Sequence, residues 1–270
     1  MTTDYAFDSG TDLGKGQLDL LSEMFDGLSR DFIGAVSARP GQRCLDLGAG
    51  NGSLARWMVE RVGPTGEVHA VDLDTTHLDA PGAHVHRHDV NDGLPDEGPF
   101  DLIHARLLLL HLERRREILT ELVGALAPGG RLVLGEFTHP LTVPLAALTT
   151  ADAELFDKVV GPGLGKVAPS AGQDYSWGRG IDWAMTEEGL TEVDSMEYHH
   201  TALGGSTGCR LYANYAAQMA PPLRALGVTD EELRRLHELL HDPRLRVQFF
   251  PFVCVRGRKP GADPGPVREA

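Results

Sequence analysis

Residues 44–58, CLDLGAGNGSLARWM, place one acidic residue and three glycines at a spacing that suits binding of a ligand through the main chain. The pattern D-x-G-x-G-x-G runs from Asp46 to Gly52, behind a short apolar run and ahead of a helix-like segment. Glycine weakens regular structure, so a cluster of glycines indicates unusual backbone angles or a ligand that approaches the backbone closely. A plain turn needs one or two glycines, and the third favours a ligand-binding loop.

The segments around this loop alternate between strand-like and helix-like patterns, which predicts an α/β fold with a parallel sheet and helices on both faces. In such a sheet, ligands bind beyond the C-terminal ends of the strands, where the glycine loop falls. The predicted strands are 43–48, 66–73, 83–90, 99–105 and 131–137, and the predicted helices among them are 12–38, 52–63 and 113–130. Further on, 192–200 and 252–257 resemble strands and 206–241 resembles helix, with Thr229 and Glu232 as a capping box.

Composition excludes several classes of protein. The 270 residues carry a formal net charge of −14, which disfavours nucleic acid and anionic membranes as partners. We find no apolar run of the ~20 residues that a membrane span requires, and the polar N-terminus does not resemble a secretory signal. Three scattered cysteines, Cys44, Cys209 and Cys254, form no disulfide framework or metal motif. These features predict a cytoplasmic protein.

Further motifs follow the glycine loop in a fixed order. Asp72 ends the second predicted strand and Asp89 the third, while FDLIHARLLLLHL and LAPGGRLVLGEF contain the fourth and fifth strands. With these motifs, residues 43–137 resemble the class I methyltransferases that use S-adenosylmethionine (SAM). The dinucleotide fingerprint G-x-G-x-x-G fits less well, because Ser53 occupies the place of its last glycine. The rest of the chain resembles, more loosely, actinobacterial small-molecule (natural-product) methyltransferases.

The resemblance implies a Rossmann-like sheet of seven strands in the order 3-2-1-4-5-7-6, with strand 7 antiparallel and a helical cap that binds the methyl acceptor. Residues 1–258 are expected to form a single methyltransferase domain. Its parts would be an N-terminal helical cap (12–38), a SAM-binding core (43–137) and an acceptor-binding cap (138–190 and 201–241). The Pro- and Gly-rich residues 259–270 are predicted to be a disordered tail.

The cofactor residues follow from the resemblance. Asp46 is expected to order the loop and face the methionine ammonium, and Asp72 to accept hydrogen bonds from the ribose hydroxyls. Asp89 matches the position that meets the adenine amino group. Gln17 matches a position where relatives often have arginine for the cofactor carboxylate. The full predicted set is Gln17, Asp46, Gly48, Gly50, Asn51, Gly52, Asp72, Leu73, Asp89, Val90, Ala105 and Arg106.

The implied fold brings His111, after the fourth strand, near Glu136, at the end of the fifth. A histidine oriented by a carboxylate is a good general base near neutral pH, and some related O-methyltransferases carry such a pair at these positions. We therefore predict that His111 is the base and that Glu136 holds its ring, with His139 as the reserve base. The alternative is a purely structural role, in which His111 merely caps the following helix.

Aromatic residues gather in the predicted cap, and they favour an apolar or aromatic acceptor. The predicted acceptor contacts are Tyr175, Trp177, Trp183, Tyr212 and Tyr215. Individually, each is more often a core residue than a ligand contact. Four basic residues share this region, so an anionic acceptor stays open: Lys158, Lys166, Arg179 and Arg210.

No metal site is predicted. His84, His86 and His88 share one strand face, but their side chains diverge and lack an acidic or thiol partner. The positions that carry magnesium ligands in catechol methyltransferases read HAR and FTH here. Methyl transfer to an oxygen of a specialised metabolite is the expected function, in a protein that could form a homodimer. The alternatives are C- or N-methylation, a non-methylating SAM-binding cyclase or isomerase, and more distantly a nicotinamide dehydrogenase.

Overall fold

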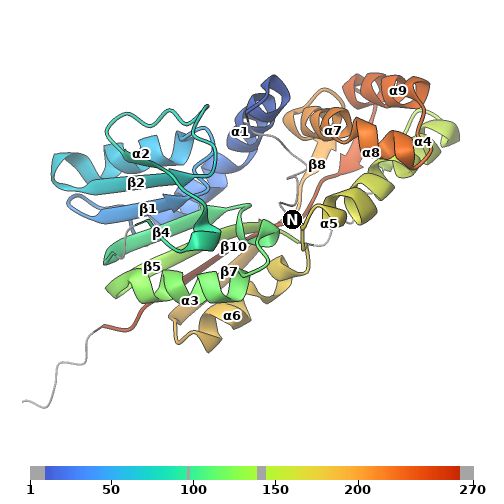
Figure 1. The fold of residues 1–270 in the computed structure, drawn as a ribbon. Helices are drawn as coiled ribbons and strands as arrows, with labels where there is room; N and C mark the ends of the chain where they lie inside the picture. The colour runs from blue at the N-terminus through green and yellow to red at the C-terminus, as the bar shows by residue number, and fades with distance from the viewer. Residues whose placement is uncertain (1–9, 96–97, 139–143, 262–270) are drawn as a thin grey trace, which may run out of the picture.

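A seven-stranded sheet forms the centre of the computed structural model, which describes residues 10–95, 98–138 and 144–261 (Figure 1). The strand order is β3-β2-β1-β4-β5-β10-β7; the first five strands run parallel, and β10 is antiparallel to both of its neighbours. The strands are β1 (Arg43–Leu47), β2 (Glu67–Asp72), β3 (His84–Arg87), β4 (Phe100–Arg106), β5 (Leu126–Phe137), β7 (Thr191–Tyr198) and β10 (Phe252–Arg258). This confirms the predicted fold class and strand order.

Helices cover both faces of the sheet because its strands are apolar on both sides. Helices α1 (Asp12–Gly34) and α2 (Ser53–Val62) lie on one face, and α3 (Arg115–Ala125) and α6 (Ile181–Glu187) on the other (Figure 1). Helix α1 ends at Gly34, four residues before the predicted end. Ala38 has a φ of 57°, an angle that a right-handed helix cannot contain.

The glycine loop joins β1 to α2 and requires its glycines. Gly48, Gly50 and Gly52 have φ angles of 67°, 57° and 80°, in the left-handed region that other residues rarely adopt. A Cβ atom on Gly52 would lie 2.6 Å from the carbonyl oxygen of Asp79, closer than van der Waals contact allows. The loop can therefore turn sharply at the C-terminal edge of the sheet and begin α2 there.

A second group of elements lies beyond that edge and forms a cap (Figure 1). Its three-stranded antiparallel sheet, in the order β6-β9-β8, was not predicted. The predicted helix 206–241 is divided into three, because Pro221, Pro222 and Gly227 interrupt it. The elements are β6 (Pro144–Ala146), α4 (Thr150–Pro162), α5 (Ala168–Ser170), β8 (Thr201–Leu203), α7 (Thr207–Gln218), α8 (Ala220–Ala225), α9 (Asp230–His241) and β9 (Arg246–Gln248).

The capping box of α9 is confirmed: the Thr229 hydroxyl accepts from the Glu232 N–H, and the Glu232 carboxylate accepts from the Thr229 N–H. At the other end of the chain, Lys259 continues the main sheet by pairing with Gly129 and Gly130. The predicted disordered tail therefore does not begin at Lys259, and residues 262–270 lie outside the described ranges. None of the described helices is long and apolar enough to cross a membrane.

Candidate active site

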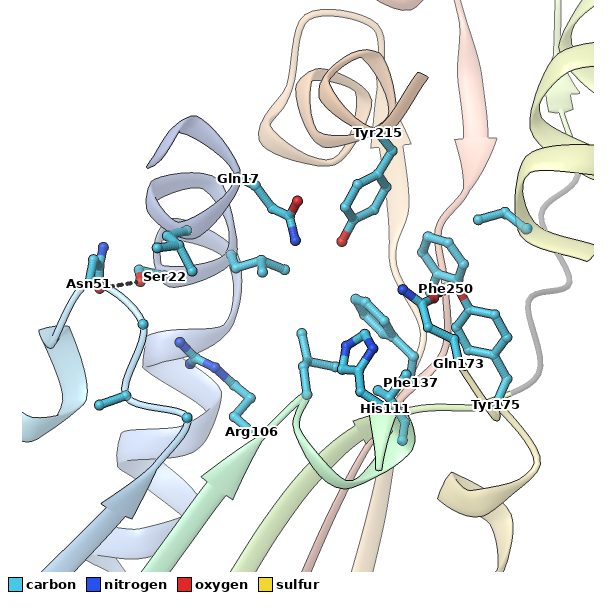
Figure 2. Close-up of a pocket in the computed structure, with 18 residues that line it drawn as sticks. Gln17, Ser22, Asn51, Arg106, His111, Phe137, Gln173, Tyr175, Tyr215 and Phe250 are labelled. Atoms are coloured by element: carbon cyan, nitrogen blue, oxygen red, sulfur yellow. Dashed lines mark hydrogen bonds between the residues drawn. The ribbon is translucent and has the colours of Figure 1, made fainter. Parts of the chain in front are cut away.

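One cavity opens at the C-terminal edge of the sheet, between the glycine loop and the cap (Figure 2). It contains about 870 Å³ of empty space, including its open mouth. Figure 2 shows Gln17 of α1 and Tyr215 of α7 pointing into it from one side, opposite His111 and Gln173. The lining residues are Gln17, Leu18, Leu21, Ser22, Gly48, Ala49, Gly50, Asn51, Arg106, Leu107, Leu110, His111, Phe137, Leu164, Gln173, Tyr175, Tyr215 and Phe250.

Asp72 orders the glycine loop. Its Oδ2 accepts a hydrogen bond of 2.8 Å from the Gly50 N–H, and its Oδ1 accepts one of 3.1 Å from the Asp74 N–H. Burial raises the pKa of the Asp72 carboxyl, and the hydrogen bonds from these backbone groups oppose that rise. The carboxylate predicted to meet the ribose therefore also fixes the backbone on which the cofactor would lie.

Asp46 does not order the loop, contrary to prediction. Its Oδ1 lies 2.7 Å from Nδ1 of His104, and both side chains are buried. Asp46 and His104 are direct partners in the register of β1 and β4, so their side chains project from the same face of the sheet. The Oδ2 of Asp46 is buried and lacks a hydrogen-bond partner among the described residues. That oxygen leaves an acceptor for a donor brought by a ligand.

The other predicted cofactor residues fall into two groups. Gln17, Gly48, Gly50, Asn51 and Arg106 line the cavity. Arg106 is bound to Asp26 of α1 at 2.9 Å, and Asn51 contacts Ser22 and Asp19 of the same helix. The remaining predicted residues lie outside the cavity lining. Asp46 and Ala105 lie in their strands, Asp72 and Leu73 lie at the end of β2, Gly52 is the N-cap of α2, and Asp89 and Val90 lie in the turn after β3. Leu73 is 59% exposed, and Asp89 caps the turn Val90–Asp92.

His111 lies in the cavity wall, at the end of the short 3-10 turn Leu109–His111 that follows β4. Burial lowers the pKa of its imidazole to about 4, and the nearby Arg115 guanidinium acts in the same direction. The ring is therefore neutral at pH 7 and can accept a proton. The reserve base, His139, lies outside the described residues.

The predicted hydrogen bond between Glu136 and His111 is absent from the described structure. Glu136 is fully buried; its Oε1 accepts from the N–H groups of Leu109 and Leu110 at 2.8 and 3.3 Å, and its Oε2 has no hydrogen-bond partner among the described residues. Glu136 thus holds the backbone of the turn that carries His111 and does not touch the ring. Burial raises the pKa of this carboxyl to about 8.

We expect Glu136→Gln to flatten the pH dependence of stability while leaving activity close to wild type. Between the ordinary pKa of about 4.5 and the raised value of about 8, only the folded protein keeps the Glu136 proton. The resulting stabilisation is complete below about pH 4.5 and is lost as the pH rises through 8. Glutamine cannot ionise, and it keeps the oxygen that accepts from the turn. In urea unfolding at pH 5 and pH 8, wild type should lose up to a few kcal/mol more than the variant. Parallel losses in the two proteins would contradict the raised pKa.

Two of the five predicted aromatic contacts line the cavity: Tyr175 and Tyr215. The prediction was wrong for Trp183, which is 65% exposed on α6, a helix that packs on β7 and β10, and which does not line the cavity. Tyr212 is buried in the cap against Phe156 and Phe249, and Trp177 is buried with Arg116 over its ring. Both side chains are buried and neither lines the cavity, so we assign Tyr212 and Trp177 to the core.

The sequence did not point to several lining residues. Leu18, Leu21 and Ser22 share the helical face of Gln17, and their spacing of one turn could have indicated them. His104 could have been found as the direct partner of Asp46 once the strand register was assumed. Gln173 and Phe250 lie in irregular segments, where no periodicity indicates which side chains face inward.

The predicted histidine face does not converge on one point. The Nε2 of His86 lies 3.1 Å from Nδ1 of His69, and the Nε2 of His88 lies 2.8 Å from the carbonyl oxygen of Gly93. Within residues 10–95, 98–138 and 144–261, no group of three or more His, Cys, Asp or Glu side chains is arranged to hold a metal ion.

The fold is that of a class I methyltransferase. Residues 19–190, more than half of the chain, match the family model described as a methyltransferase domain, and the chain belongs to that family of SAM-dependent enzymes.

The curated relatives are named ubiquinone/menaquinone biosynthesis C-methyltransferase UbiE. The protein from Bordetella avium is 31% identical over 47% of this chain and 54% of its own length; that from Vibrio parahaemolyticus is 30% identical over 59% and 64%. The chain thus spans between half and two thirds of these relatives. A solved structure of Haemonchus contortus phosphoethanolamine N-methyltransferase 2, bound to phosphomonomethylethanolamine and S-adenosylhomocysteine, has a TM-score of 0.57 at 15% identity. The match covers 96% of this chain and 60% of the Haemonchus chain, and it supports the fold alone.

The residues present fit SAM as the cofactor. The Oδ2 of Asp46, which is buried just outside the cavity lining and has no hydrogen-bond partner among the described residues, offers an acceptor for an ammonium group. Gly48 and Gly50 of the glycine loop line the cavity, so a ligand can approach the backbone there. Figure 2 shows the amide nitrogen of Gln17 pointing into the cavity, where it can donate to a carboxylate. The exposed Leu73, next to Asp72, offers an apolar surface for the adenine ring of the cofactor.

Proposed function

We propose that this protein methylates a hydroxyl oxygen of an uncharged small molecule and that His111 takes the proton from that hydroxyl. The observation that carries the proposal is the shared cavity: the glycine loop lines one side of it, and His111 lines the other with the aromatic residues of the cap. A base that is neutral at pH 7 suits a hydroxyl, which is a weak nucleophile until its proton leaves.

The roles of the residues follow from their places. When bound, SAM supplies an electrophilic methyl group on a sulfonium. Asp46, Gln17 and the loop residues would hold its methionine part, and Asp72, Leu73, Asp89 and Val90 its adenosine. Phe137, Phe250 and Tyr175 would orient the acceptor and exclude water, which gives catalysis by positioning. Glu136 would act through the turn that it holds.

Carbon methylation is the second candidate, and it is favoured by the names of the curated relatives, which are C-methyltransferases. A nucleophilic carbon of an electron-rich ring gives up its proton once the methyl group has bonded to it, so His111 could serve both reactions. The third candidate is a protein of this fold that binds SAM without transferring its methyl group. It remains open because the cofactor loop would be the same in a protein that transfers the methyl group and in one that does not.

Tritiated SAM and a metabolite extract separate these candidates. We expect label to move to a small molecule, and the position of the methyl group in the purified product distinguishes oxygen from carbon. The same label transfer should persist in EDTA, since the described residues offer no cluster of metal ligands. Tight SAM binding without any transfer would favour the non-methylating candidate. Loss of transfer in EDTA, restored by magnesium, would contradict the metal-free mechanism.

We also propose that this protein is a natural-product methyltransferase of actinobacterial type and that its acceptor is a specialised metabolite. The support is the resemblance of residues 138–258, which is looser than that of the cofactor core. Three buried free cysteines support a reducing compartment, and we propose the cytoplasm. The division into a SAM-binding core and an acceptor-binding cap, and the homodimer, stay predictions.

A further inference from the structure

Among the described residues, the acceptor side of the cavity is lined by apolar and aromatic side chains without charge. Phe137 and Phe250 stack with ring centroids 4.8 Å apart, and Tyr175 stacks on Phe250 at 6.2 Å. Among the described lining residues, Arg106 is the one permanently charged side chain, and it is paired with Asp26, which also pairs with Arg30. The cap cations considered above do not line the cavity; Lys158 and Arg210 are paired with Glu232 and Glu23. An anionic or cationic acceptor on the aromatic side would therefore lose its hydration without gaining a partner of opposite charge among the described residues there.

Gln173 supplies a fixed hydrogen-bond donor in this wall. Its side chain is 7% exposed, and its Oε1 accepts a hydrogen bond of 2.6 Å from the Tyr175 hydroxyl. That bond orients the amide, so its NH₂ group points into the cavity toward His111 (Figure 2). The NH₂ group donates to none of the described residues. A buried donor held in this way favours a ligand that brings an acceptor atom.

We propose that Gln173 determines specificity by recognising a second, neutral oxygen of an aromatic acceptor, a ring carbonyl or ether, while the reacting position lies at His111. Only the part that places the reacting position at His111 rests on the proposed function. Tyr175 acts as a positioning residue, because its hydroxyl fixes which end of the Gln173 amide faces the cavity.

Two matched probes test the inference by calorimetry on protein saturated with S-adenosylhomocysteine. The compound 5-hydroxy-1-tetralone carries a hydroxyl and a ketone, and 5,6,7,8-tetrahydro-1-naphthol has the same ring system with the hydroxyl alone. Wild type should bind the ketone at least tenfold more tightly, because the other probe leaves the Gln173 donor unpaired. The anion 1-naphthoate should bind more weakly than either.

Gln173→Leu should reduce the preference for the ketone to near onefold while leaving the affinity for the naphthol unchanged. Gln173→Glu, of equal size but without the donor, should also lose the preference. Both variants should keep the wild-type affinity for S-adenosylhomocysteine, since Gln173 lies outside the proposed cofactor residues. Their melting temperatures should fall, because leucine removes the acceptor of the Tyr175 hydroxyl and glutamate brings a charge to a buried site, so binding is measured well below the transition. Leu226, 49% exposed at the end of α8, gives a surface control as Leu226→Gln.

The inference is overturned if wild type shows no preference for the ketone, if Gln173→Leu retains it, if 1-naphthoate binds most tightly, or if neither neutral probe binds at millimolar concentration. The methyl-transfer assay reports separately on the proposed function. A retained ketone preference without label transfer to any acceptor would overturn the methylation proposal and leave the role of Gln173 in place.

Discussion

His111→Ala is expected to lower kcat by about 10²- to 10⁴-fold while SAM affinity stays near wild type. The imidazole lies in the cavity wall and, with a pKa lowered to about 4, it is unprotonated throughout the neutral range. Without it, the acceptor hydroxyl would have to lose its proton to water. The loss should therefore appear in turnover and not in cofactor binding. Steady-state kinetics with a SAM titration measure both quantities.

The pH profile offers an independent check of this base. Because His111 gains its proton only near pH 4, wild-type kcat should be flat from pH 6 to pH 8 and fall in acid. His199, which is exposed on the cap side of β7, gives a matched control, and His199→Ala should leave kcat unchanged. Near-normal turnover of His111→Ala would refute the assignment and leave His139→Ala to be measured. If that variant also turned over normally, an acceptor that needs positioning alone would be favoured, and the oxygen proposal would fall.

Asp72→Ala is expected to weaken SAM binding by at least tenfold. The substitution removes the oxygens that would accept from the ribose hydroxyls, and it leaves the Gly50 N–H without its acceptor at 2.8 Å. An unpaired buried partner costs about 1–3 kcal/mol, and a tenfold loss of affinity corresponds to about 1.4 kcal/mol. Calorimetry with SAM measures the change.

Asp72→Asn separates the two contributions. Asparagine keeps one oxygen for the Gly50 N–H but accepts fewer hydrogen bonds from a ribose, so its loss should be smaller than that of alanine. Equal affinities in wild type and Asp72→Ala would remove Asp72 from the cofactor site. Asp74→Ala, two residues beyond the end of β2 and half-buried, should bind SAM as wild type does.

The cofactor half of the fold could be predicted from local patterns. Alternating apolar strands and amphipathic helices specify a parallel sheet, and consecutive strands of such a sheet follow a small number of topologies. The glycine loop could also be predicted, because glycine adopts the positive φ angles seen at Gly48, Gly50 and Gly52 without steric cost. The cap could be predicted less well. The strands of its small sheet have three residues each, which is too short for a periodic signal, and the paired strands lie far apart along the chain: 99 residues separate β6 from β9 and 42 separate β8 from β9.

The sequence by itself determined the fold class, the cofactor loop and the position of Asp72 at the end of its strand. Only the tertiary structure decided which groups each side chain meets. Asp46 meets His104, 58 residues away, and Glu136 meets the turn that carries His111, where a contact with its ring was expected. The rotation of the cap helix α7, set by packing over its whole surface, buried Tyr212 and turned Tyr215 toward the cavity, and the packing of α6 on the main sheet left Trp183 exposed. Backbone conformation depends largely on neighbours along the chain, whereas side-chain partners depend on elements that meet only after folding.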